Sequence, residues 1–284
     1  MGGNSKMSKI IDCHIHVFQQ QWDNEQFQRH LSAAGIDEGF IISLPPDTFQ
    51  VLLGGLQATD QERLEILLKY CNESPALVPV YWINPLATDV KQQIERAVTA
   101  GVKAFKVICN TFMPGTPQAL DCYQLIANTG CPILFHSGIL WDGEPSSDYN
   151  RPANFEPLLK VEKLRFSLAH ISWPWVDELI AVYGKFSNAH QRNPNLSCEM
   201  FIDTTPGTPK IYRREALTKL FTVGYDIENN IIFGSDSTTH DYRVDWSREW
   251  IEYDSAILKD LNINQHVIDK MFYNNAKRFL TGIK

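Results

Sequence analysis

The sequence lacks several features that would each indicate a particular class of protein. No apolar run approaches the roughly eighteen residues that a membrane-spanning helix needs, and no G-x-G-x-x-G motif follows an apolar run. The six cysteines stand singly with no C-x-x-C pair, which indicates buried free thiols. Positive charge is not in excess, because 26 basic and 33 acidic residues give a net charge of −7. These absences argue against membrane, dinucleotide-binding and nucleic-acid-binding proteins.

The N-terminal segment also lacks the apolar stretch of a secretion signal. We therefore expect residues 1–8 to form a disordered tail and the protein to be cytoplasmic. With 44% hydrophobic residues among 284, the chain is long enough to bury a large core. No low-complexity linker or shift in composition divides it, so residues 9–284 are predicted to form a single catalytic domain.

Eight short apolar runs, rich in β-branched or aromatic residues, alternate with longer amphipathic stretches. The predicted strands are residues 10–18, 39–44, 77–83, 102–108, 132–136, 165–170, 196–202 and 231–233. Gly35, Gly101 and Gly130 each end a helical pattern, where a left-handed residue is favoured. Strands and helices alternating over a length near the roughly 250 residues typical of barrels predict an α/β fold, a closed (β/α)₈ TIM barrel. Two further helices, at 245–261 and 264–280, are expected to follow.

The first predicted strand reads Ile11-Asp12-Cys13-His14-Ile15-His16-Val17. Because strand side chains point to opposite faces in turn, we expect Asp12, His14 and His16 to face the barrel interior. The four apolar side chains of this strand would then face the helices. Two imidazoles and a carboxylate are costly to bury unless something binds them. Neutral imidazoles directed at one point suit a divalent transition metal.

Polar residues also end three later strands, where His136, His170 and Asp236 stand. The C-terminal ends of parallel barrel strands share one rim, so these side chains are expected to surround its mouth together with His14 and His16. Together they would supply enough ligands for a metal site. The alternative is that the five are unrelated and that each satisfies backbone groups at its own strand end.

In this order, the elements resemble the amidohydrolase superfamily, most closely the amidohydrolase-related branch that includes the aminocarboxymuconate-semialdehyde decarboxylase type. The resemblance spans nearly the whole chain and rests on Asp12-x-His14-x-His16, His136, His170, Gly234-Ser235-Asp236 and the closing Asn274-Asn275-Ala276-Lys277-Arg278-Phe279-Leu280. It implies that His14, His16, His136 and Asp236 are metal ligands and that His170 manages protons on a metal-bound water. The branch is usually mononuclear and often oligomeric. We therefore expect one divalent metal, zinc or alternatively manganese, and a homodimer or higher homo-oligomer.

The implied roles fit the chemistry of the residues. A bound cation lowers the pKa of its water toward about 7 and polarises a carbonyl oxygen. Asp236 can be ligand and proton acceptor together, and His170 can take a proton from the water and return it to a leaving group. We expect a metal-dependent hydrolase whose metal-bound hydroxide attacks an ester, lactone or amide carbonyl of a small anionic substrate. A nonoxidative decarboxylase of a small carboxylic acid and a noncatalytic metal-binding barrel remain as alternatives.

Three more residues are candidates for contact with the substrate. Lys106, near the end of the fourth predicted strand, could bind a substrate carboxylate if it points inward, or could become a carboxylated bridge between two metals. Arg151, in the long loop after the fifth strand, could clamp a carboxylate, although a surface ion pair is an equal alternative. His240 lies four residues beyond Asp236, close enough to touch a substrate, or is a loop residue without a role.

Overall fold

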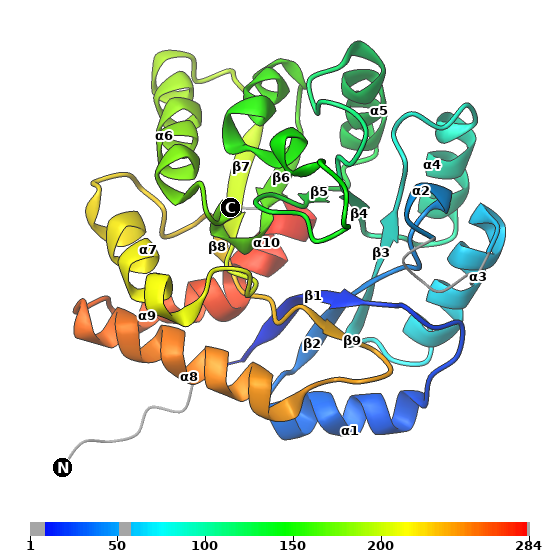
Figure 1. The fold of residues 1–284 in the computed structure, drawn as a ribbon, viewed down its shortest axis with the longest axis horizontal. Coiled ribbons are helices and arrows are strands. Elements are labelled where there is room, and N and C mark those ends of the chain that lie inside the picture. Colours follow the sequence, from blue (N-terminus) through cyan, green and yellow to red (C-terminus); the bar gives the residue numbers. More distant parts are fainter. Residues whose placement is uncertain (1–8, 51–57, 283–284) are drawn as a thin grey trace.

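The computed structural model describes residues 9–50 and 58–282, so the predicted tail, residues 1–8, lies outside the described residues. Its strands form one parallel sheet in the order β8-β7-β6-β5-β4-β3-β2-β1-β9. The strands are β1 (Ile11–His16), β2 (Glu38–Ile42), β3 (Leu77–Trp82), β4 (Ala104–Val107), β5 (Ile133–Phe135), β6 (Arg165–Leu168), β7 (Glu199–Asp203), β8 (Ile231–Ile232) and β9 (Ser237–Thr238). Each of the eight predicted strands overlaps one of β1 to β8. The predicted alternation of strands and helices is visible around the sheet (Figure 1).

The two ends of the sheet are joined through a single stretch of chain. β8 pairs with β7, whereas β9, which follows after four residues, pairs with β1. Backbone hydrogen bonds continue this pairing, because the Cys13 amide donates to the Phe233 carbonyl at 2.9 Å and the Asp236 amide donates to the His14 carbonyl at 3.0 Å. One segment therefore bridges β7 and β1 and closes the ring. The predicted (β/α)₈ TIM barrel is confirmed, with its eighth strand divided in two.

Helices cover the outside of the barrel (Figure 1). They are α1 (Asn24–Ala34), α2 (Asp47–Gln50), α3 (Asp60–Cys71), α4 (Val90–Thr99), α5 (Pro117–Asn128), α6 (Val176–Arg192), α7 (Lys210–Thr222), α8 (Val244–Asp260), α9 (Gln265–Asp269) and α10 (Asn275–Thr281). Gly35, Gly101 and Gly130 have φ values of 79°, 106° and 81°, so the predicted left-handed helix ends are present. Among the described residues, no helix combines the length and the apolar character needed to cross a membrane.

The connection between β5 and β6 departs from the α-helical pattern. It contains two 3₁₀ segments, η2 (Ser147–Asn150) and η3 (Pro152–Lys160), and no α-helix. Pro157 lies inside η3, where it has no amide hydrogen to donate to a regular helical ladder. η3 contacts α6, so this segment takes the place of the missing α-helix beside the barrel.

Strand β1 does not alternate as the sequence suggested. Asp12 pairs with Gly39 and Ile15 with Ile41, so β1 has one residue more than β2 between these pairs. As a result Ile11 and Cys13 pack with the apolar residues of the barrel interior, while Ile15 packs with the helix layer. The expected inward position of Asp12 was wrong, because its carboxylate accepts a hydrogen bond from Tyr242, whose ring contacts Phe27 of α1. His14 and His16 point inward as predicted.

The lower part of the barrel interior is apolar and is closed by the C-terminal helix. Phe40, Val80, Leu134, Phe201 and Ile232 belong to a buried cluster that also includes Ala276 and Phe279 of α10. The rings of Phe201 and Phe279 lie 5.0 Å apart, edge to face. Among the described residues, this plug fills the end of the barrel opposite the C-terminal ends of the strands.

Two buried arginines hold the strand ends at this open side. Arg63 of α3 donates to the carbonyls of Leu44 and Trp82, after β2 and at the end of β3. Arg213 of α7 donates to the carbonyl of Thr204 and pairs with the buried Asp254. Since buried carbonyls need donors, these contacts fix the backbone on which the interior side chains stand.

Candidate metal centre and active site

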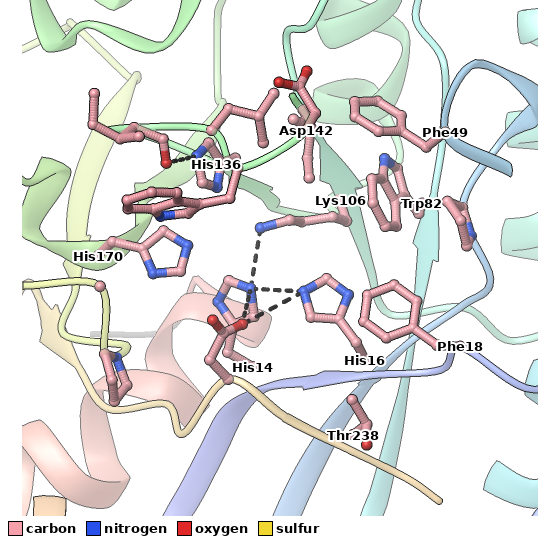
Figure 2. A pocket seen from close by; sticks show the side chains of 18 of the residues that line it. His14, His16, Phe18, Phe49, Trp82, Lys106, His136, Asp142, His170 and Thr238 are labelled. Atoms are coloured by element: carbon pink, nitrogen blue, oxygen red, sulfur yellow. Dashed lines mark hydrogen bonds and ion pairs between the residues drawn. The ribbon is translucent and has the colours of Figure 1, made fainter. Parts of the chain in front are cut away.

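A cavity of about 790 Å³ opens at the C-terminal ends of the strands. His14 and His16 enter it from β1, Lys106 from β4, and Asp236 from the turn between β8 and β9. The rings of Phe18, Phe49 and Trp82 gather on one side of these polar groups (Figure 2). His16 stacks on Phe18 with ring centroids 5.1 Å apart, which fixes the imidazole.

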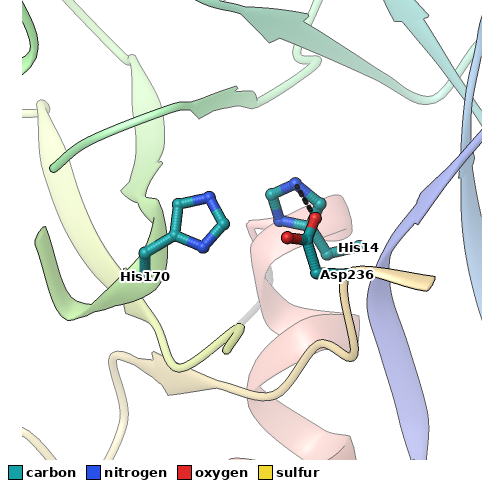
Figure 3. Close-up of side chains that lie close together, drawn as sticks. All are labelled: His14, His170 and Asp236. Carbon is teal, nitrogen blue, oxygen red and sulfur yellow. Dashed lines mark ion pairs between the residues drawn. The ribbon is translucent and has the colours of Figure 1, made fainter. Parts of the chain in front are cut away.

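Three of the four predicted ligands converge closely. The Nε2 atoms of His14 and His16 lie 3.2 Å apart, and each lies 3.8 Å from Oδ1 of Asp236. His170 completes a group with His14 and Asp236 whose ligand atoms all lie within 4.8 Å of one another (Figure 3). The imidazoles and the carboxylate that were predicted from distant strand ends therefore share one rim.

His136, the fourth predicted ligand, stands next to this group in a different contact. Its ring centroid lies 4.9 Å from that of His170, and its Nε2 lies 3.2 Å from the carbonyl oxygen of Ile139. The structure thus places His136 at the edge of the cluster, where it lines the same cavity.

The donor set suits a divalent transition metal. Burial holds the pKa of His14, His16 and His136 well below its usual range, and it lowers the pKa of His170 to about 4. These rings are therefore neutral at pH 7, and neutral imidazole nitrogens together with a carboxylate oxygen are the ligands that zinc and related metals take. The residues present fit such a cation.

The backbone is strained where two of these side chains are attached. His170 has φ 63° and begins a run of left-handed residues with Ile171 (φ 48°) and Ser172 (φ 52°), while Asp236 has φ 58°. A β-branched residue in this region is uncommon, and strained backbone is found most often at functional sites. Gly207 packs against this turn so closely that a Cβ there would lie 2.7 Å from Cβ of His170. The fold therefore bears a conformational cost to direct these side chains into the cavity.

Lys106 points into the barrel, as its proposed role requires. It is fully buried, and its Nζ lies 3.2 Å from Nε2 of His14 (Figure 2). Burial lowers the pKa of Lys106 to about 8, and burial, partly offset by the lysine charge, raises the pKa of Asp236 to about 6. The positively charged ammonium group of Lys106 thus lies within reach of any group that binds beside His14.

Two buried carboxylates support the cluster: Asp12, which was expected to face the interior beside His14, and Asp203, which was not singled out in the sequence. Asp203, the last residue of β7, accepts a hydrogen bond from Nδ1 of His14 at 2.9 Å. Asp12 accepts hydrogen bonds from the amide of Ser235 at 2.9 Å and from its hydroxyl at 2.5 Å, next to Asp236. Asp203 carried the same signal as the predicted residues, since it is a polar residue directly after an apolar run.

The remaining predicted contacts lie further out. His240 is exposed at the mouth of the cavity, close to Arg243, which the sequence reading also missed. Arg151 does not line the cavity: its guanidinium pairs with Glu178 at 2.7 Å and lies over the ring of Trp175. The structure therefore brings His240 to the site and leaves Arg151 in a surface ion pair.

The barrel and the histidine–aspartate cluster at its mouth define a class, the TIM-barrel enzymes with a metal centre at the C-terminal rim. A family model described as amidohydrolase matches residues 11–281, and the chain belongs to the amidohydrolase family. The predicted family, and with it the prediction of an enzyme, is confirmed. No curated protein sequence matches the chain at a significant level.

Several solved structures share the fold at low identity. The 2,6-dihydroxybenzoate decarboxylase from Rhizobium is similar with a TM-score of 0.62 at 14% identity, over 96% of this chain and 99% of that one. The 4-oxalomesaconate hydratase from Rhodopseudomonas palustris gives 0.59 at 15% identity, over 96% and 95%. The dihydroorotase from Campylobacter jejuni gives 0.56 at 12% identity, over 97% and 84%. Proteins named for three different reactions share this architecture, so the fold by itself does not select one.

Proposed function

We propose that the protein is a metal-dependent hydrolase that acts on an ester, lactone or amide carbonyl of a small anionic substrate. One divalent cation, zinc or alternatively manganese, would be held by His14, His16, His136 and Asp236. When bound, such a cation lowers the pKa of a coordinated water and polarises a carbonyl oxygen. The observation that carries the proposal is the convergence of His14, His16, Asp236 and His170 in one cavity of the barrel.

His170 is proposed as the group that moves protons. Its ring is buried and neutral at pH 7, with a pKa lowered to about 4, so it can accept a proton from a nucleophile. Its ligand atom lies within 4.8 Å of those of His14 and Asp236, within the space that one water or one reacting group fills. The left-handed turn that carries it keeps the ring at this place.

Lys106 supports an anionic substrate. The negative charges that act on the buried Lys106 ammonium group are those of Asp203 and Asp236, and a bound divalent cation would balance both of them. A carboxylate of the substrate would then supply a negative charge to Lys106 beside His14. His240 at the mouth and Arg151 in the surrounding loop stay as weaker candidates for substrate contact, and carboxylation of Lys106 stays an alternative to substrate binding.

The test begins with the protein purified without added metal. Its metal content is measured, the protein is loaded with zinc or manganese, and turnover is measured on a panel of small esters, lactones, amides and aromatic carboxylic acids in water enriched in oxygen-18. Hydrolysis places one labelled oxygen in the acid product. The variant His266→Ala, on the exposed surface of α9, is the matched control for loss of a histidine.

The alternatives give different results in the same assay. Release of carbon dioxide without uptake of labelled oxygen would identify a nonoxidative decarboxylase. Such an enzyme would use the same metal ligands, and Lys106 would bind the carboxylate of its substrate. Stoichiometric metal without turnover on any member of the panel would favour a noncatalytic metal-binding barrel. A protein that binds no divalent metal would refute the proposal.

Three further expectations accompany the proposal. Residues 9–284 are proposed to form one catalytic domain, and the protein is proposed to be cytoplasmic and at least a homodimer. Light scattering of the purified protein measures the oligomeric state directly, and a monomer at micromolar concentration would contradict the last of these.

A further inference from the structure

Asp203 is a buried carboxylate that does not reach the cavity. Its side chain is 0% exposed, and it does not line the space around Lys106 and Asp236. Oδ1 accepts hydrogen bonds from both the amide (2.7 Å) and the hydroxyl of Thr205, and Oδ2 accepts from Nδ1 of His14 at 2.9 Å. Burial raises the pKa of Asp203, and the two Thr205 donors oppose that shift. Every one of its close contacts is therefore a donor, as an ionised carboxylate requires.

This arrangement determines where His14 carries its proton. A carboxylate only accepts hydrogen bonds, so Nδ1 of His14 must be the protonated nitrogen and Nε2 must carry the lone pair. That lone pair points to the place where Nε2 of His16 (3.2 Å) and Oδ1 of Asp236 (3.8 Å) gather. The tautomer that Asp203 selects is the one in which Nε2 can bind a cation.

We propose that Asp203 is a positioning residue that fixes the tautomer and ring orientation of His14, so that Nε2 faces the cation site. The cation site itself rests on the proposed function, whereas the tautomer of His14 does not. Hydrogen bonds of this kind from a ligating histidine to a carboxylate raise metal affinity, and their loss lowers it about 10- to 100-fold.

The substitution Asp203→Asn tests this with little change of shape. Thr205 offers two donors to one oxygen, so the oxygen of the introduced amide is expected to turn toward Thr205. The NH₂ group of that amide then faces Nδ1 of His14, which must accept and therefore lose its proton. Nε2 becomes protonated and can no longer bind a cation, a tautomer error of the type known to inactivate an enzyme with intact geometry.

Two measurements follow on the metal-free proteins. Nitrogen-15 chemical shifts of the imidazoles report the tautomer of His14, which we expect as Nδ1–H in the wild type and Nε2–H in Asp203→Asn. Competition with a chromophoric chelator then reports affinity for Zn²⁺, which we expect to fall about 10- to 100-fold in Asp203→Asn. Thr205→Val, which keeps the bond to His14, is expected to lose less affinity than Asp203→Asn, and the distant Asp89→Asn is a control expected to stay within about twofold.

The outcomes separate this inference from the proposed function. An Nε2–H tautomer of His14 in the wild type would overturn the inference even if Asp203→Asn failed to fold. Equal losses of zinc affinity in Asp203→Asn and Thr205→Val would also overturn it, since both would then act through general loosening. Failure of the wild type to bind Zn²⁺ would refute the proposed function, while the tautomer measurement would still show whether Asp203 holds His14.

Discussion

Both halves of the barrel interior are filled by side chains that point inward from the strands. The two halves differ in the chemistry of those side chains. The lower half is filled with apolar side chains such as Phe40 and Phe201, and α10 closes it. The upper half holds His14, Lys106 and Asp203, all buried and all polar. The lower half contributes stability through burial, whereas the upper half contains groups that are costly to bury until a ligand binds them. Stability and binding are thus separated along one axis, and substitutions can test that separation.

Removal of a ligand in the upper half should give the largest effect. His14→Ala takes away the imidazole around which the cluster is arranged, so we expect loss of stoichiometric zinc and about a thousandfold loss of turnover, equivalent to about 4 kcal/mol. Elemental analysis and steady-state kinetics measure both quantities. Full metal content with unchanged turnover would show that His14 is not a ligand.

A cavity in the lower half should damage stability and spare the site. Phe201→Ala removes a fully buried ring that packs on Phe279, so the free energy of unfolding should fall by about 3–5 kcal/mol. Urea titration measures this loss, and metal analysis of the folded protein should give the wild-type ratio. If zinc is lost in proportion to stability, the two halves are coupled more strongly than the comparison implies.

The pH dependence of stability should reveal His170. In the folded, metal-free protein its pKa is lowered from 6.5 to about 4 by burial, so between these values only the unfolded chain takes up the proton. Stability is therefore lost as pH falls, by about 2 kcal/mol between pH 7 and pH 5 from this one group. His170→Asn should show a correspondingly smaller loss over that interval than the wild type, and His266→Asn should not. Identical pH profiles for wild type and His170→Asn would contradict the buried, neutral ring.

Lys106 should lower the stability of the folded protein while it contributes to the binding of an anionic substrate. Its burial lowers the pKa to about 8, so replacement by methionine, which has a similar length and no charge, should raise the free energy of unfolding of the metal-free protein by about 1–2 kcal/mol. Turnover of anionic substrates should fall in the same variant. A variant that is both less stable and fully active would show that Lys106 is a structural residue.

Arg151 should give the smallest effect. Its ion pair with Glu178 is exposed, and such pairs contribute little, so Arg151→Gln should leave the urea midpoint of unfolding at the wild-type value. KM should change by less than about twofold, because Arg151 does not line the cavity in the structure. A tenfold rise in KM for an anionic substrate would instead restore it as a substrate ligand.

The sequence was sufficient to predict the barrel and the convergence of the site residues. Both follow from the regular alternation of apolar and amphipathic segments along the chain. Apolar runs that alternate with amphipathic stretches mark the strands, and glycines such as Gly35 mark the helix ends. The shared rim of parallel strands then brings His14, His170 and Asp236 together without any knowledge of the loops.

The sequence was insufficient where one residue shifts the register or where a contact is long-range. The extra residue in β1 between Asp12 and Ile15 reversed the expected orientation of Asp12. The local sequence pattern does not predict such a shift of register. Asp203 is 189 positions from His14, so its hydrogen bond depends on the packed barrel. The surface pairing of Arg151 depends on the course of the 3₁₀ connection between β5 and β6.

The divided last strand gives the protein a particular order of assembly. His14 belongs to the first strand and Asp236 to the turn that completes the ring, so residue 236 must have left the ribosome before the two side chains can lie together. Until that turn inserts between β7 and β1, the proposed site lacks Asp236, one of its four proposed ligands. Metal binding is therefore expected to follow the last step of folding. A nascent chain that is released before residue 231 should not bind zinc.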